Sequence, residues 1–208
     1  MRSHDEHTGV SGRARRRVLR YFEPRVRQSR YSYRSVGWTS SRNQRLRFRM
    51  LCEAGDLEDR SILDVGCGVG HFYEYLKEHV NQFQYRGIDF CEDMVACAST
   101  TFPEAHFETQ DVLTYAPHEC FDYVVGAGIY NVSTGDNEQV MSRIVEKMYT
   151  LCSTAVAVTM THGREFRHTI IHSYSKENML ACAQRLTPHV QIRTGFIPNH
   201  FVIYLYRP

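Results

Sequence analysis

Three glycines at alternate positions follow an apolar segment early in the chain. The segment 62–65 is apolar apart from Asp64, and glycines stand at Gly66, Gly68 and Gly70. Glycine adopts positive φ without steric cost and lets a ligand approach the backbone closely. The pattern therefore predicts a tight turn from a strand into a helix, with a small ligand held on the turn. A purely structural glycine turn is the alternative.

Two further aspartates stand at the ends of the next two predicted strands. Asp89 ends the segment 85–89, 23 residues after Gly66, and Asp111 follows the segment 107–110. A carboxylate at the end of the second strand of such a unit accepts both hydrogen bonds of a ribose diol, and this spacing suits a nucleoside on the first turn. For Asp89, a solvated aspartate at a strand end is the alternative.

The glycine spacing separates two cofactor families. A dinucleotide-binding turn carries a glycine at the position occupied here by His71. Alternate glycines after an aspartate instead resemble the first motif of the class I S-adenosylmethionine (SAM) dependent methyltransferases. The resemblance covers about residues 31–208 and implies that SAM is bound by the first motif, which comprises Asp64, Gly66, Cys67, Gly68 and Gly70.

The same resemblance assigns the rest of the nucleoside site. It implies that Asp89 binds the ribose hydroxyls and that Phe90 and Met94 cover one face of the adenine, although either could be core. It further implies that Asp111 accepts a hydrogen bond from the adenine amino group and that the backbone amide of Val112 faces a ring nitrogen.

The end of the fourth predicted strand should face the acceptor. Enzymes that methylate amino groups of DNA, and many that act on rRNA, carry an Asn/Asp-Pro-Pro-aromatic motif there. This chain reads Gly-Ile-Tyr-Asn over 128–131, without proline. The departure weakens a nucleic-acid function, and the missing Pro-Cys pair argues against a C5-cytosine enzyme. Tyr130 and Asn131 are the candidates for contact with the sulfonium or the acceptor, with a structural turn as the alternative.

Two groups of side chains elsewhere could complete such a site. His172 and Tyr174, with His162 and His168, follow the fifth predicted strand, where a general base would suit methylation of nitrogen or oxygen; solvated histidines are the alternative. No Asp or Glu accompanies them at metal-ligand spacing, so we expect no metal site.

An aromatic loop precedes the glycine turn. Aromatic faces stabilise a sulfonium cation, so Tyr33 and Trp38, with Tyr31, would form the inner face of a lid, unless they are packing alone. Gln44 or Arg47, in the helix predicted after this loop, would reach the methionine carboxylate.

Composition places the chain among ordinary globular proteins. It has 208 residues, 42% of them hydrophobic and 23% charged, and no apolar run approaches the ~18 residues of a membrane helix. Seven cysteines are spread singly without a Cys-x-x-Cys pair, which indicates reduced thiols. We therefore expect a cytoplasmic protein.

Charge is distributed unevenly along the chain. Residues 1–53 contain 14 arginines and no lysine against four acidic residues, whereas the remainder is acidic. We predict that residues 1–16 are a disordered basic tail and that residues 17–55 form a helical lid. The tail would meet a nucleic acid or an anionic substrate, or fold against its own acidic domain.

Strand and helix patterns alternate from residue 56 to the end, as in an α/β domain. We expect a Rossmann-like seven-stranded sheet, mainly parallel with the last strand antiparallel, with helices on both faces. The strands are predicted at 61–65, 84–89, 105–109, 121–126, 154–161, 189–194 and 200–206. The helices are predicted at 18–28, 40–52, 70–80, 92–102, 135–151 and 175–186.

These features favour a SAM-dependent transferase that methylates nitrogen or oxygen of a small molecule in a closed pocket, because little sequence is inserted between the later strands. An enzyme that cyclises SAM to azetidine-2-carboxylate and methylthioadenosine fits the same motifs. A nucleic-acid methyltransferase guided by the basic tail and a non-catalytic SAM-binding module are further alternatives. The acceptor and the oligomeric state stay open.

Overall fold

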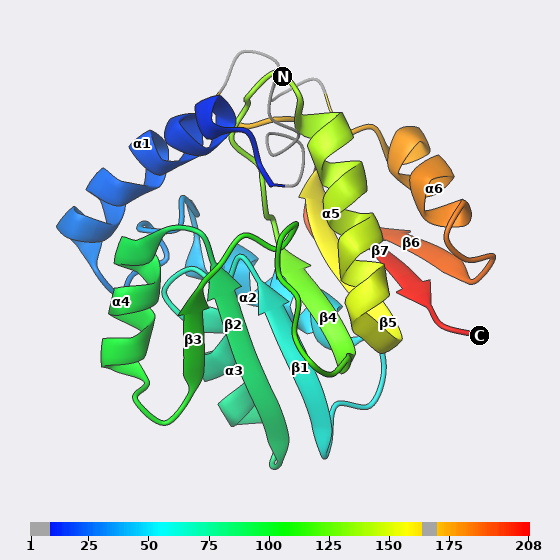
Figure 1. Ribbon diagram of the computed structural model, residues 1–208, viewed down its shortest axis with the longest axis horizontal. Helices are drawn as coiled ribbons and strands as arrows, with labels where there is room; N and C mark the ends of the chain where they lie inside the picture. Colours follow the sequence, from blue (N-terminus) through cyan, green and yellow to red (C-terminus); the bar gives the residue numbers. More distant parts are fainter. Residues whose placement is uncertain (1–8, 164–169) are drawn as a thin grey trace, which may run out of the picture.

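A seven-stranded sheet forms the centre of the molecule (Figure 1). The computed structural model describes residues 9–163 and 170–208. The strand order is β3-β2-β1-β4-β5-β7-β6. The strands are β1 (Arg60–Val65), β2 (Phe83–Asp89), β3 (His106–Thr109), β4 (Phe121–Ala127), β5 (Cys152–Thr161), β6 (Val190–Thr194) and β7 (His200–Tyr206).

Strand directions confirm the predicted fold. The pairs β1 with β2 and β4, β2 with β3, and β4 with β5 are parallel, whereas β7 runs antiparallel to both β5 and β6. The connection between β6 and β7 is too short for a helical crossover, so the two strands must form a hairpin. In the sheet, β7 lies between β5 and β6.

Helices cover both faces of the sheet. On one face lie α2 (Ser41–Cys52) and α3 (His71–His79), and on the other lie α5 (Asn137–Leu151) and α6 (Lys176–Gln184) (Figure 1). Helix α4 (Glu92–Thr101) lies beside β3 at the edge of the sheet, where Phe102 at its end contacts Tyr73 of α3. Successive side chains of β1 point to opposite faces of the sheet. Ile62 belongs to the core cluster that includes α2 and α3, and Leu63 belongs to the cluster that includes α5. A strand buried on both faces reads as a continuous apolar run, which is why the sequence predicted it well.

The first helix corrects one prediction. Helix α1 spans Gly12–Ser29 and packs against α4, so residues 12–16 are helical and not part of a disordered tail. The Ser11 side chain caps the helix by accepting a hydrogen bond from the Ala14 amide (3.3 Å), and Ala14 is buried against the main core. Burial against distant segments outweighs an Arg-rich local composition, which alone suggested disorder. Residues 1–8 lie outside the described part of the chain.

No helix in residues 9–163 and 170–208 is long and apolar enough to cross a membrane.

Candidate functional site

The turn after β1 requires glycine for two reasons. Gly66 and Gly68 have φ of +69° and +56°, in the left-handed region that other residues rarely adopt. A Cβ on Gly66 would lie 2.5 Å from Cγ2 of Ile129, and one on Gly68 would lie 2.7 Å from Cγ1 of Val36. The turn is therefore packed tightly between the end of β4 and the loop before α2.

Asp89, at the end of β2, is tied to this turn. Its carboxylate accepts hydrogen bonds from the amides of Gly68 (3.1 Å) and Cys91 (2.9 Å). Burial raises the pKa of Asp89, and these backbone hydrogen bonds counteract the rise. Two donors leave further lone pairs on the carboxylate for a diol that lies on the turn.

Asp64 lies beneath the turn in an almost dry environment. Its side chain is 1% exposed and accepts a hydrogen bond from the Tyr85 hydroxyl (2.8 Å). Burial raises the pKa of Asp64 to about 7, because the charged form loses its hydration; the Tyr85 bond acts in the opposite sense.

Asp111 follows β3 and holds one donor on each carboxylate oxygen. Oδ1 accepts from the Leu113 amide (3.0 Å), and Oδ2 accepts from the Val10 amide (2.8 Å). The first contact is local, whereas the second joins the start of the described chain to the third strand.

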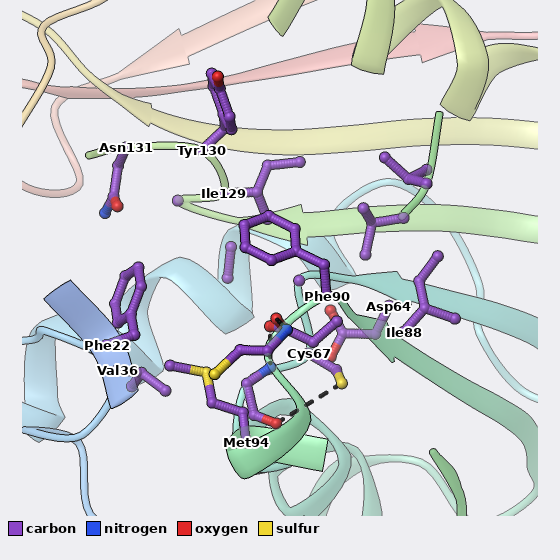
Figure 2. A pocket seen from close by; sticks show the side chains of 18 of the residues that line it. Phe22, Val36, Asp64, Cys67, Ile88, Phe90, Met94, Ile129, Tyr130 and Asn131 are labelled. Atoms are coloured by element: carbon purple, nitrogen blue, oxygen red, sulfur yellow. Dashed lines mark hydrogen bonds between the residues drawn. The ribbon is translucent and has the colours of Figure 1, made fainter. Parts of the chain in front are cut away.

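A cavity of about 110 Å³ opens at the carboxyl ends of β1 to β4 (Figure 2). Figure 2 places Phe90, Met94 and Asp64 on one side and Asn131 near Phe22 on the other. Thirteen of the sequence-predicted residues line it together. They are Trp38, Gln44, Asp64, Gly66, Cys67, Gly68, Asp89, Phe90, Met94, Asp111, Val112, Tyr130 and Asn131.

Several predicted residues lie outside the cavity lining, among them the following four. Gly70 begins α3 and faces the rings of Phe102 and Phe107. Tyr33 lies beside the Arg34 guanidinium, 5.5 Å from its ring centroid. His172 and Tyr174 lie behind the loop that follows β4. None of these four is placed for direct contact with a ligand in the cavity.

Sequence reasoning missed an apolar contribution from the chain start. Val10 and the α1 residues Val18 and Phe22 line the cavity, together with Val36 and Ile129. The signal for α1 was present, because Ala14, Val18 and Phe22 recur at helical spacing among the arginines.

The cavity is lined beside α2 by a neutral polar pair. Gln44 of α2 lines it, as the sequence suggested, and its amide nitrogen lies 3.1 Å from Nδ1 of His71. Burial lowers the pKa of His71 to about 4, so the imidazole is neutral near pH 7 and presents hydrogen-bonding groups without charge.

Trp38 lines the cavity, and its indole ring packs against Arg47. The Arg47 guanidinium lies 4.1 Å from the Trp38 ring centroid and contacts the His200 imidazole. Burial lowers the pKa of Arg47 to about 10, which leaves it charged near pH 7. Arg47 therefore holds the indole by a cation–π contact and is not itself part of the cavity lining.

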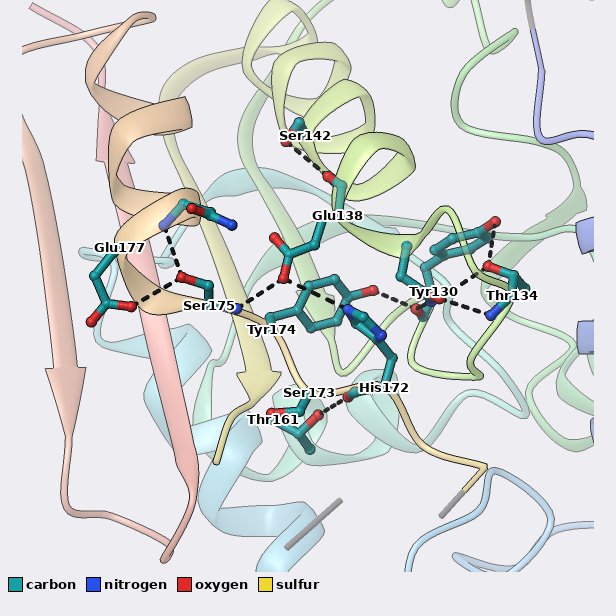
Figure 3. Close-up of polar contacts among 12 residues, drawn as sticks. Tyr130, Thr134, Glu138, Ser142, Thr161, His172, Ser173, Tyr174, Ser175 and Glu177 are labelled. Atoms are coloured by element: carbon teal, nitrogen blue, oxygen red, sulfur yellow. Dashed lines mark hydrogen bonds and ion pairs between the residues drawn. The ribbon is translucent and has the colours of Figure 1, made fainter. Parts of the chain in front are cut away.

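The loop after β4 is held in a strained conformation (Figure 3). Tyr130 has φ +50°, unusual for an aromatic residue. Its carbonyl accepts hydrogen bonds from the Tyr174 hydroxyl and from the Asn137 side-chain amide (3.1 Å), and its own hydroxyl donates to Asp136 (3.1 Å). Figure 2 shows the Tyr130 ring directed away from the cavity centre and the Asn131 amide directed toward Phe22.

His172 supports the same loop. Its backbone amide donates to the Asn131 carbonyl (2.7 Å), and its Nε2 lies 3.6 Å from Oε1 of Glu138. Glu138 also accepts from the Ser175 amide (2.9 Å), so α5 ties the loop after β4 to the segment before α6. Tyr174 thus holds the Tyr130 carbonyl and His172 holds the Asn131 carbonyl, so both support the loop that carries Asn131.

Sequence comparisons relate part of the chain to methyltransferases. Residues 62–149 match a family described as "Methyltransferase domain". Two curated proteins named trans-aconitate 2-methyltransferase are similar to the chain. The one from Sinorhizobium medicae is 34% identical over 68 residues, which are 33% of this chain and 26% of that protein. The one from Variovorax paradoxus is 29% identical over 108 residues, which are 52% of this chain and 41% of that protein. The chain thus matches less than half the length of either relative.

Solved structures with low sequence identity share the fold. Magnesium protoporphyrin IX methyltransferase from Synechocystis, with bound S-adenosylhomocysteine (SAH), superimposes with a TM-score of 0.70 at 15% identity, over 94% of this chain and all of that one. The N-methyltransferase NodS from Bradyrhizobium japonicum, also with SAH, gives a TM-score of 0.69 at 15% identity, over 92% and 99% of the two chains.

Proposed function

We propose that this chain, a class I SAM-dependent methyltransferase by its domain and its fold, transfers the methyl group of SAM to nitrogen or oxygen of a small molecule. One observation carries the proposal. The ends of three successive strands bring Gly68, Asp89 and Asp111 to one cavity, in the order needed for a nucleoside, and the end of β4 closes that cavity with Asn131.

The nucleoside half of SAM would lie along β1 to β3. Asp89, already oriented by two backbone amides, would accept the ribose hydroxyls. Asp111 and the Val112 amide would receive the adenine, with Phe90 and Met94 against its faces. Asp89, Phe90 and Asp111 are half-buried, so bound ligand would displace water from them and strengthen each hydrogen bond.

The methionine half would extend toward α2. Gln44 and the neutral His71 would bind its carboxylate and amine, and the raised pKa of Asp64 would fall again beside an ammonium group. Trp38, held by Arg47, would face the sulfonium. SAM supplies a methyl group on a sulfonium that departs readily, so the remaining task of the protein is alignment of the acceptor.

The acceptor end is small and carries no positive side chain. Among the described residues that line the cavity there is no arginine or lysine, and Asn131 presents a polar side chain directed toward Phe22 (Figure 2). This supports a small acceptor with a neutral amine or hydroxyl, held by the Asn131 amide, over an acceptor with several carboxylates. A cytoplasmic location stays a prediction.

The test begins with SAM and the purified chain. Incubation with SAM and a panel of small amines, alcohols and carboxylic acids should yield SAH only when an acceptor is present, with the methyl group recovered on the acceptor. Formation of methylthioadenosine from SAM alone would overturn methyl transfer in favour of cyclisation.

Two matched variants connect the activity to the site. Asp89→Asn should weaken SAH binding by roughly tenfold to a hundredfold, the effect of one lost hydrogen bond to a charged group. Asp122→Asn makes the same chemical change near the start of β4, at the amino ends of the strands and away from the cavity, and should leave SAH binding unchanged. Equal binding by the two variants would contradict the assignment of Asp89.

A further inference from the structure

Arg47 of α2 carries a charge that no carboxylate compensates. The residue is 4% exposed, and within residues 9–163 and 170–208 it forms no ion pair. Its guanidinium donates instead to the Asn43 carbonyl (2.8 Å) and to Nε2 of His200. A buried charge without a counter-ion is costly, because it has lost its hydration. Arg47 therefore keeps an attraction for an anion that the fold itself does not satisfy.

The neighbours of Arg47 in α2 line the cavity, whereas Arg47 does not. Gln44 and Phe48 are both part of the lining. Residues three or four apart lie on the same side of a helix, so Arg47 lies beside Gln44 on the side that faces the cavity. Trp38 accounts for the difference, because its indole lines the cavity and the Arg47 guanidinium lies 4.1 Å from the centroid of its ring. The indole therefore covers the charge on the side of the cavity.

The end of β4 leaves room for this indole. A Cβ on Gly128 would lie 2.5 Å from Cη2 of Trp38, so a side chain at this position would displace the ring. Gly128 also lines the cavity, three residues before Asn131. The Trp38 backbone is held in addition by its amide, which donates to the Tyr33 carbonyl (3.0 Å). Trp38 thus lies at the end of the cavity where the acceptor would bind.

We infer that Trp38 determines which acceptors the site takes: its indole screens Arg47 from the cavity, so that acceptors with a carboxylate are excluded and uncharged ones are admitted. This inference rests on the proposed function. The charged groups that do reach the cavity include the carboxylates of Asp89 and Asp111, which repel an anion. Without the indole, the guanidinium faces the cavity and attracts a carboxylate, because hydrogen bonds between charged groups are stronger than those to neutral groups.

The test compares benzoate with benzamide, two probes of similar shape of which only benzoate is charged. Calorimetric titration is carried out with methylthioadenosine present, which fills the nucleoside end and has no carboxylate of its own. Trp38→Ala should bind benzoate roughly tenfold more tightly than benzamide, the effect of one charge-assisted hydrogen bond. The unaltered chain should show no preference for benzoate. The double variant Trp38→Ala with Arg47→Gln should lose the preference again.

Three results would overturn the inference. Trp38→Ala could bind benzamide as well as benzoate or bind neither, which would mean that the indole does not cover an anion site. The unaltered chain could prefer benzoate, which would mean that Arg47 is already open to the cavity. The preference could also survive Arg47→Gln, which would assign the carboxylate to another group.

A milder variant keeps the test decisive if Trp38→Ala does not fold, as thermal unfolding would show. Trp38→Phe leaves a smaller ring against Arg47, and acetate and acetamide are the matched probes for the smaller space. Acetate should bind more tightly than acetamide, and equal affinities would count against the inference. Absence of SAH binding by the unaltered chain would overturn the proposed function, whereas SAH binding without a carboxylate preference in the Trp38 variants would overturn this inference alone.

Discussion

Replacing Asp64 with asparagine should change how the stability of the protein depends on pH. Asp64 is 1% exposed and its pKa is raised to about 7 from an ordinary value of 3.8, chiefly because burial disfavours the carboxylate. The folded protein therefore holds this proton more tightly than the unfolded chain. The contribution of the protonated Asp64 carboxyl to folding stability is fully present below pH 3.8 and is lost as the pH rises through 7.

The size of the effect follows from the shift. One pKa unit corresponds to about 1.36 kcal/mol, so ionisation of Asp64 costs the folded state about 4 kcal/mol at pH 8 and about 2 kcal/mol at pH 5. Asparagine does not ionise. The stability of Asp64→Asn relative to the unaltered protein should thus rise by about 2–3 kcal/mol between pH 5 and pH 8. Any cost of the buried amide is independent of pH and cancels in this difference.

Urea unfolding of both proteins at the two pH values measures the difference directly. Asp122→Asn is the control, and its stability relative to the unaltered protein should stay constant between pH 5 and pH 8, because the lowered pKa of Asp122 lies below that range. Although desolvation raises the pKa of Asp122, donation from the Ser61 amide and hydroxyl outweighs it and the pKa is lowered. That variant should lose stability relative to the unaltered protein as the pH rises through the acid range. If the stabilities of Asp64→Asn and the unaltered protein change in parallel with pH, the burial argument for Asp64 is refuted.

Two further substitutions test the packing of the site. Gly68→Ala should destabilise the domain by about 1–2 kcal/mol because of the left-handed backbone, and by more because its Cβ would lie 2.7 Å from Val36. Gly135→Ala is the control: Gly135 has φ +96° and nothing within 4 Å of the added Cβ, so chemical unfolding should show the backbone cost alone. Equal losses of stability in the two variants would refute the steric clash with Val36. Tyr174→Phe should cost about 1–3 kcal/mol by removing a donor from the strained Tyr130 carbonyl, and should leave the Kd for SAH unchanged in calorimetry; a weakened Kd would place Tyr174 in direct contact with the cofactor.

The order of strands and helices followed from local patterns in the sequence. Buried parallel strands are continuous apolar runs, and caps such as Ser40 before α2 are set by neighbouring residues. The glycine turn and Asp89 were equally readable, because a strand end and a tight turn impose their residue types on a short segment. For these features the physical constraint lies within a few residues of the residue itself.

The tertiary structure decided which side chains share the cavity. Asp111 and Val10 lie 101 residues apart in the sequence, and Tyr174 and Tyr130 lie 44 apart, yet each pair is joined by a hydrogen bond. No local pattern encodes such a contact, since it depends on how α1 and the segment before α6 pack on the finished sheet. The sequence by itself determined the glycine turn and the strand-end carboxylates that suit a nucleoside. Only long-range packing decided that the chain start covers one of those carboxylates and that Tyr174 supports the loop instead of facing the ligand.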